Sequence, residues 1–144
     1  MARQDFRFHV SKRVRYAEID GQKVVFNSRY LEYFDLGMTE YWRAAGVNEI
    51  YGDETPEFHV ARSEVNYRAP ILFDEEIDIC VRVGRVGRSS MTIEFEIHGK
   101  DRDDLRADGI LVDVHVAEAQ GAVQPVPDDF LALFEKFEGR ALRG

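Results

Sequence analysis

Asp20 and Asn27 are the residues whose types and spacing best suit chemistry at a carbonyl group. Both lie in the segment VRYAEIDGQKVVFNSRY, residues 14–30. A carboxylate can attack a carbonyl carbon directly or activate a water molecule, and free N–H groups at a helix start can hold the oxyanion that develops. An acid a few residues before a helix start can therefore face the carbonyl that the helix amides hold. The alternative is an ordinary turn, since Gly21 follows the acid.

The other reactive residue types show no comparable pattern in the sequence. The four histidines are dispersed and lack ligand spacing, so we predict no metal site: His9, His59, His98 and His115. Cys80 lies in an alternating apolar run with no histidine nearby, which indicates packing rather than a nucleophile. Glu18 is interpreted as a structural acid that is either exposed or directed at the helix.

The spacing of apolar residues predicts the elements that would position the candidate acid. Residues 13–17 have the pattern of a strand, which places the acid just past its end. Asn27 or Ser28 can cap a helix that extends to Ala45 and stops at the following glycine. The apolar face of this helix leaves only a narrow polar sector, so a sheet is expected to enclose it.

Four longer strands and a short helix are predicted after the long helix. Apolar and polar side chains alternate over residues 58–69, 77–83, 91–97 and 105–118, the last with Ile110, Val112, Val114 and Val116 on one face. Hairpin-like connections join these strands, and residues 128–137 form a short amphipathic helix. This order is typical of an α+β fold in which an antiparallel sheet wraps a helix. Exposed edge strands favour pairing between subunits, so a homo-oligomer is expected.

Length and composition predict one domain over residues 1–144. The 19 basic and 27 acidic residues give a net charge of −8, which argues against nucleic acid as a partner. The single cysteine excludes an intramolecular disulfide and suits a reducing compartment. The sequence contains neither a signal-peptide pattern at its start nor a run of apolar residues long enough to span a membrane, so a cytoplasmic location without membrane partners is expected.

Five segments in order resemble the hotdog-fold acyl-CoA thioesterases, specifically their 4-hydroxybenzoyl-CoA thioesterase-like branch. These are RYAEID, VVFNSRYLEYFD, ARSEVNYRAPILFDEEIDICVRV, GRSSMTIEFEI and PVPDDF, which together cover most of the chain. The resemblance implies a hotdog fold, in which a five-stranded antiparallel sheet wraps a long central helix and a short C-terminal helix follows. It also implies an acyl-CoA thioesterase that needs no cofactor, because coenzyme A is part of the substrate. Homodimers or homotetramers are expected.

The resemblance assigns roles to particular residues. Asp20 matches the catalytic carboxylate, as nucleophile or general base, and Asn27 matches the helix-start amide that polarises the thioester carbonyl. Expected substrate contacts are Lys23, Val24, Tyr30, Arg88, Ser89 and Ser90. Arg88, Ser89 and Ser90 fit an ordinary hairpin turn equally well. Glu32 and Asp35 are reserve candidates, because related hotdog branches carry the catalytic acid on the long helix.

Lys23 departs from the family pattern, which usually has glycine three residues after the acid. Glycine permits backbone angles that lysine disfavours, so the sequence allows a loop conformation that differs from the family's. Lys23 is also a candidate ion-pair partner for Asp20 or Glu18. The departure keeps open a non-catalytic acyl-CoA-binding module as an alternative. A hotdog dehydratase or hydratase is a weaker alternative, since it requires a histidine near the strand-to-helix junction and the sequence has none there. The sequence does not decide the chemistry of the acyl group. It also does not decide whether the thiol carrier is coenzyme A or acyl carrier protein.

Overall fold

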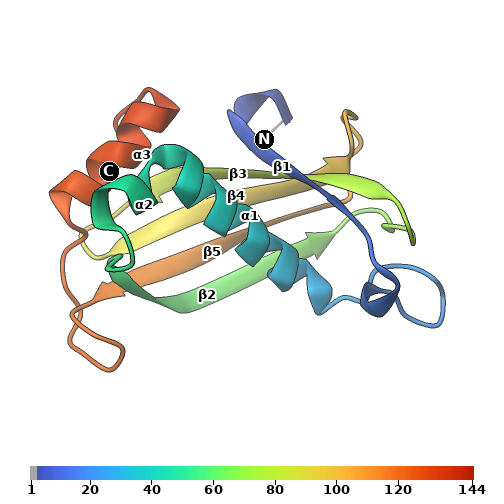
Figure 1. Cartoon of the computed structure of the whole chain (residues 1–144), viewed down its shortest axis with the longest axis horizontal. Helices are drawn as coiled ribbons and strands as arrows, with labels where there is room; N and C mark the ends of the chain where they lie inside the picture. Colours follow the sequence, from blue (N-terminus) through green and yellow to red (C-terminus); the bar gives the residue numbers. More distant parts are fainter. Residues whose placement is uncertain (1–2) are drawn as a thin grey trace.

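A five-stranded antiparallel sheet encloses the long helix α1 in the computed structural model, which describes residues 3–144 (Figure 1). The strands are β1 (Phe8–Arg13), β2 (Glu57–Tyr67), β3 (Glu76–Val86), β4 (Ser90–Gly99) and β5 (Ala107–Val116), in the spatial order β1-β3-β4-β5-β2. The helices are α1 (Arg29–Ala45), α2 (Val47–Tyr51) and α3 (Asp128–Glu138), with two short 3-10 turns, η1 (Arg3–Asp5) and η2 (Tyr16–Glu18). The predicted hotdog architecture is confirmed.

The first strand lies earlier than predicted. Residues 13–17 were expected to be a strand, but β1 ends at Arg13 and the chain turns into η2. The cause is Glu18, whose carboxylate accepts a hydrogen bond from the Arg15 backbone N–H at 2.9 Å and so closes a tight turn. An alternating pattern does not reveal that a later side chain will take the backbone donor of the strand.

The sheet order also corrects the expected connections. Strands β3, β4 and β5 follow one another as hairpins, but β2 pairs with β5 rather than with its successor β3. The chain therefore crosses the sheet between β2 and β3. This crossing makes β1 and β2 the two edge strands.

Close packing between α1 and the sheet depends on two glycines. A Cβ atom at Gly37 would lie 2.7 Å from Ile79 Cγ2, so only glycine lets the helix approach β3 this closely. A Cβ at Gly109 of β5 would lie 2.7 Å from the Phe34 ring, which stacks on Phe95 with 4.3 Å between ring centroids. The small residue on β5 therefore makes room for a large one on α1, and Ile110 lies on the opposite face.

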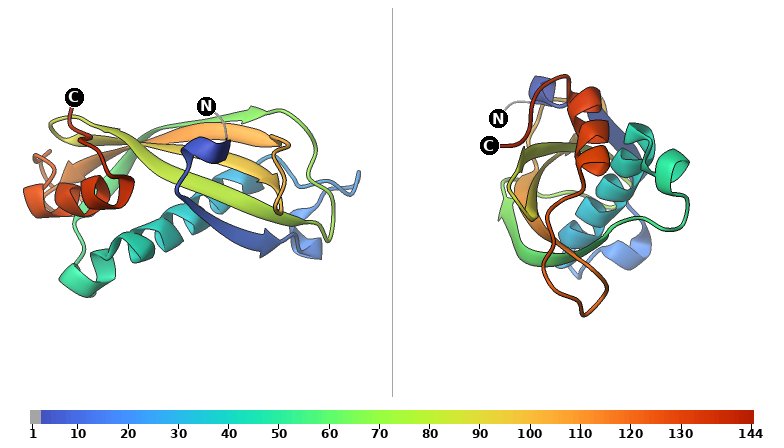
Figure 2. Two further views of the ribbon diagram at one scale, coloured as in Figure 1. Left: turned by 90° about the horizontal axis from the view of Figure 1, so that it is seen from above. Right: turned by 90° about the vertical axis from the view of Figure 1, so that its left-hand side faces the viewer.

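Strand β2 is exposed along its edge and over much of both faces. Val60 is 60% exposed and Tyr67 is 55% exposed, because α1 packs mainly on β3 and β1. Figure 2 shows the sheet curving around α1, with α3 near the helix end remote from its start. In the described residues 3–144, no helix has the length and apolar content needed to cross a membrane.

Candidate active site

Asp20 lies at the tip of a small two-stranded loop that leads into α1. The loop is held by hydrogen bonds from Asp20 N–H to Val24 O at 2.9 Å and from Phe26 N–H to Glu18 O at 3.0 Å. Asp20 Oδ1 accepts the Gln22 backbone N–H at 2.8 Å, which is an aspartate turn. Within residues 3–144, Oδ2 receives no hydrogen bond. One oxygen thus fixes the rotamer, while the other is available to a ligand.

Lys23 adopts the left-handed backbone conformation that a glycine would favour, with φ of 63°. The loop therefore keeps the course expected with glycine, at the strain cost that a side chain carries there. The Lys23 ammonium pairs with neither Asp20 nor Glu18 in the described chain. Glu18 is paired instead with Lys12 and Arg15.

Replacing Lys23 with glycine is expected to leave stability nearly unchanged. Relief of left-handed strain, about 1 kcal/mol, is offset by the greater freedom of glycine in the unfolded chain. Chemical denaturation of both proteins measures the difference. A loss of more than about 1 kcal/mol would show that the lysine side chain has a structural partner.

A cleft of about 490 Å³ opens beside this loop. It is lined by Tyr16, Ile19, Asp20, Gly21, Lys23 and Phe73. Tyr16 and Phe73 are exposed and contact each other edge to face, with 5.8 Å between ring centroids. The cleft therefore combines a carboxylate, a cation and two aromatic rings within one short stretch of surface. None of the four histidines lines it.

The start of α1 presents free backbone donors close to this loop in the chain. Ser28 occupies the position before the helix, but its side chain forms no capping hydrogen bond, and neither does that of Asn27. In residues 3–144 the N–H groups of Asn27 and Ser28 have no acceptor. The expected side-chain cap is thus not formed. Two unpaired N–H groups at a helix N-terminus are suited to an anionic oxygen.

Glu18 ties together the elements around the loop. Its buried carboxylate accepts hydrogen bonds from the Arg15 backbone and side chain, accepts another from Tyr33 Oη at 2.9 Å, and pairs with Lys12 Nζ at 2.9 Å. Burial alone would raise the pKa of Glu18, but these donors outweigh it and lower the pKa to about 2. One structural acid therefore holds together strand β1, turn η2 and helix α1. Glu18 faces the helix, which was one of its two predicted orientations.

Replacing Glu18 with glutamine should destabilise the fold by about 3 kcal/mol at pH 7, because Lys12 and Arg15 lose their buried partner. The pKa is depressed on folding, so this contribution is present above the unfolded pKa and is lost as pH falls through about 2. Denaturant titrations of both proteins from about pH 8 to about pH 3 should therefore show the difference narrowing below about pH 4.5. A constant difference would contradict the ionic role.

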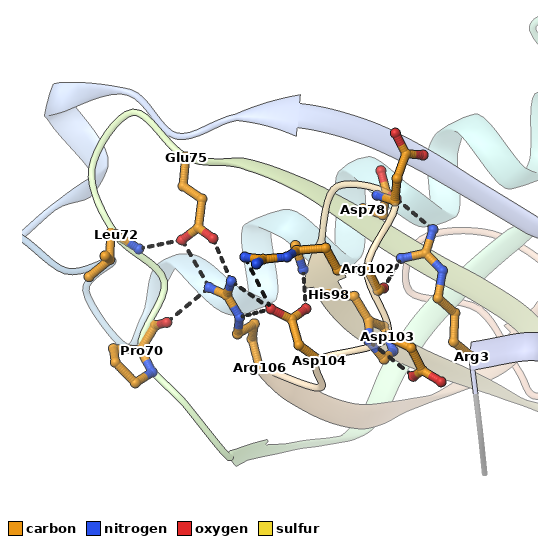
Figure 3. A network of polar contacts seen from close by, with 12 residues as sticks. Arg3, Pro70, Leu72, Glu75, Asp78, His98, Arg102, Asp103, Asp104 and Arg106 are labelled. Carbon is orange, nitrogen blue, oxygen red and sulfur yellow. Dashed lines mark hydrogen bonds and ion pairs between the residues drawn. The ribbon is translucent and has the colours of Figure 1, made fainter.

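A second polar network supports the loop from the sheet side (Figure 3). The buried Arg106 side chain bonds both oxygens of Glu75, at 2.9 and 2.5 Å, and Asp104 Oδ2 at 2.9 Å, and donates to Pro70 O at 3.1 Å. The Arg106 guanidinium thereby lowers the pKa of Glu75. Glu75 in turn accepts the Leu72 N–H at 3.0 Å.

The segment that Arg106 holds is paired with the Asp20 loop. Val25 N–H donates to Ile71 O at 2.8 Å, Phe73 N–H donates to Lys23 O at 3.2 Å, and Val24 forms a bridge with Leu72. Arg106 thus positions one wall of the cleft without touching it. Sequence reasoning missed this residue, because nothing in the local pattern around it marks a buried arginine.

The remaining predicted contacts lie apart from the cleft. Tyr30 is buried and packs edge to face on Tyr67, while Val24 is half-buried within the loop. Glu32 pairs with Arg29 on the exposed side of α1, and neither it nor Asp35 lines the cleft. Residues 88–90 form the β3–β4 turn and the start of β4. In Figure 1 this turn lies at the end of β3 remote from the loop that precedes α1. The 11 residues of β3 separate these ends by about 33 Å.

A long helix enclosed by a five-stranded sheet, with an acid-bearing loop before the helix, places the chain in the class of hotdog-fold proteins. A family model described as "Thioesterase superfamily" matches residues 22–105, more than half of the chain. The chain belongs to this superfamily.

Solved structures of thioesterases show the same fold. A thioesterase from Thermus thermophilus, complexed with coenzyme A and Zn, is 29% identical, with a TM-score of 0.80 over 96% of this chain and 99% of that one. A thioesterase superfamily structure from Jannaschia sp. CCS1 is 24% identical, with a TM-score of 0.80 over 95% and 86%. A 1,4-dihydroxy-2-naphthoyl-CoA thioesterase from Synechocystis is 15% identical, with a TM-score of 0.77 over 88% and 94%. These matches support a hydrolase.

Proposed function

We propose that this chain hydrolyses an acyl-CoA thioester to a free acid and coenzyme A. Asp20 serves as nucleophile or general base, and the free N–H groups at the start of α1, near Asn27, stabilise the oxyanion. The observation that carries this proposal is the geometry of Asp20, whose Oδ1 is fixed by Gln22 while Oδ2 is left unbonded beside a 490 Å³ cleft. Oxyanion donors of this kind act most strongly where water is excluded.

Each site is completed by two subunits in this proposal. The predicted coenzyme A contacts Arg88, Ser89 and Ser90 lie the length of β3 from Asp20 in one chain, too far apart to flank one thioester. A two-fold dimer formed through the exposed edge strand β2 would bring one end of a subunit to the opposite end of its partner. A homodimer, or a tetramer of two such dimers, therefore provides what one chain lacks.

The prediction that no metal or other cofactor is required belongs to this proposal, as does a cytoplasmic location without nucleic acid or membrane partners. Coenzyme A is the thiol carrier in this proposal, and acyl carrier protein is the alternative.

A thiol-release assay on the purified protein tests the proposal. Short-chain, long-chain and aromatic acyl-CoA thioesters are each offered, free thiol is followed with a thiol reagent, and the molar mass is measured by light scattering under assay conditions. We expect release from at least one thioester by an oligomer. Thermal stabilisation by acyl-CoA with no turnover would indicate the binding module instead, and an active monomer would contradict the shared site.

A further inference from the structure

Tyr67, the last residue of β2, contacts the backbone at the start of α1. Its Oη atom donates a hydrogen bond to Asn27 O at 3.0 Å. Asn27 O belongs to the same residue as one proposed oxyanion donor, the Asn27 N–H, and to the same peptide group as the other, the Ser28 N–H. The Tyr67 hydroxyl therefore holds the short piece of backbone that carries both donors.

The helix itself constrains this carbonyl only weakly. Tyr30 N–H donates to Asn27 O at 3.4 Å, which is long for a hydrogen bond between a backbone N–H and a carbonyl. Ser28, in the position before the helix, adds no side-chain cap. The bond from the Tyr67 hydroxyl is shorter than the one from the helix, so Tyr67 is the stronger constraint on the orientation of Asn27.

The Tyr67 hydroxyl extends from a well-anchored part of the sheet. Tyr67 lies within the β2–β5 ladder, and the next two residues, Arg68 and Ala69, donate their N–H groups to Arg106 O at 2.8 and 3.0 Å. The Tyr67 ring packs edge to face on the buried Tyr30 ring, with 4.9 Å between ring centroids. A phenylalanine at this position would keep these backbone and ring contacts, so the hydroxyl can be removed without other changes.

The bond from Tyr67 matters more to the direction of the two donors than to the stability of the fold. Tyr67 is 55% exposed, so water can replace its hydroxyl bond in the unfolded chain and the net gain on folding is small. Oxyanion donors, in contrast, act only at the correct distance and angle, and small displacements lower the rate steeply. A carbonyl that accepts a hydrogen bond also polarises the N–H of its own peptide group, here that of Ser28.

Building on the proposed thioesterase function, we propose that Tyr67 is a positioning residue for the oxyanion donors. Its hydroxyl touches neither the thioester nor Asp20 and acts through the Asn27 carbonyl. The donors act most strongly in the transition state, where negative charge develops on the carbonyl oxygen. Loss of the hydroxyl should therefore lower kcat and kcat/KM together and leave KM nearly unchanged.

Tyr67→Phe tests this assignment. We expect kcat for the preferred thioester to fall about 10-fold, which is less than the loss on deleting an oxyanion donor, because both donors are still present. KM should stay within about 2-fold of the wild type, and the midpoint of denaturant unfolding should be nearly unchanged. Tyr51→Phe is the matched control, because it removes a hydroxyl bonded to Asp129 at 2.6 Å, outside the candidate site. Its kcat should stay within about 2-fold of the wild type.

A dithioester substrate, in which sulfur replaces the carbonyl oxygen of the same acyl-CoA, shows whether the loss involves the oxyanion. Sulfur accepts hydrogen bonds weakly, so the donors contribute little to its turnover. The ratio of kcat/KM for the thioester to that for the dithioester should therefore be about 10-fold lower in Tyr67→Phe than in the wild type, and unchanged in Tyr51→Phe. Loss of the dithioester absorbance follows the reaction.

Each other outcome of these measurements contradicts the assignment. An unchanged kcat in Tyr67→Phe, or an equal loss with thioester and dithioester, overturns the positioning role while the thioesterase function stands. A raised KM with unchanged kcat overturns it in favour of a contact between Tyr67 and the substrate. Absence of hydrolysis by the wild-type protein with every thioester overturns both the positioning role and the proposed function.

Discussion

Asp20→Asn is expected to lower kcat/KM for the preferred thioester by about 100-fold or more, with little change in stability. The amide oxygen of asparagine can still accept the Gln22 N–H that fixes the turn, so the loop keeps its shape. The substitution removes the charge that attacks the carbonyl or activates water, and either role contributes about 100-fold or more. Thiol-release kinetics and denaturant unfolding measure the two effects separately.

Asp74→Asn provides the control for this substitution. Asp74 is an exposed acid next to Phe73 of the cleft wall, and its backbone is left-handed with φ of 66°, a conformation that asparagine tolerates. The substitution removes one negative charge at the same end of the molecule, as Asp20→Asn does. The activity of Asp74→Asn should stay within about 2-fold of the wild type. If both variants kept full activity, catalysis by Asp20 would be excluded and the reserve acids on α1 would be the next to test.

Arg106→Met is expected to destabilise the protein by about 3 kcal/mol and also to lower activity. The change leaves Glu75 and Asp104 without the cation that both contact, and removing one partner of a buried network is more harmful than losing a surface pair. Activity should fall because Glu75 holds Leu72, and the segment of Leu72 is paired with the Asp20 loop. Denaturant unfolding and thiol release give the two results.

Arg68→Met is the control that distinguishes loss of this network from loss of an ordinary surface charge. Arg68 is exposed and pairs with Asp108 at 2.9 Å, so its loss should have only a small effect on stability and leave activity unchanged. Arg106→Lys keeps the charge but lacks the planar fork that bonds both oxygens of Glu75, and should recover only part of the stability and part of kcat. Full stability in Arg106→Met would show that the network is dispensable.

The sequence predicted those parts of the fold that repeat along the chain. Alternating residues marked the strands that follow α1, and helical spacing with a terminal glycine marked α1 itself, because each pattern depends on neighbours close in sequence. The pairing of β2 with β5 was missed, since it joins residues far apart in the chain, such as Val65 and Gly109, and leaves no local trace. The early end of β1 was missed for the related reason that Glu18 takes a backbone donor of the preceding turn.

The candidate site was only partly predictable. Asp20 and Asn27 were found because a short segment carries both, and Lys23 stood out because glycine was expected there. Arg106 is absent from that prediction, since its importance arises from burial and from partners that only the folded chain reveals.

The separation of Asp20 from Arg88 along β3 has a consequence for mixtures of inactive variants. If each centre takes its acid from one subunit and its nucleotide contact from the other, an Asp20→Asn chain and an Arg88→Ala chain are each defective at both centres of their own dimers. A hybrid of the two chains concentrates both defects in one centre and leaves the other intact. Co-refolding the two variants should therefore restore up to half of the wild-type turnover per hybrid dimer, through complementation between protein chains that are inactive by themselves.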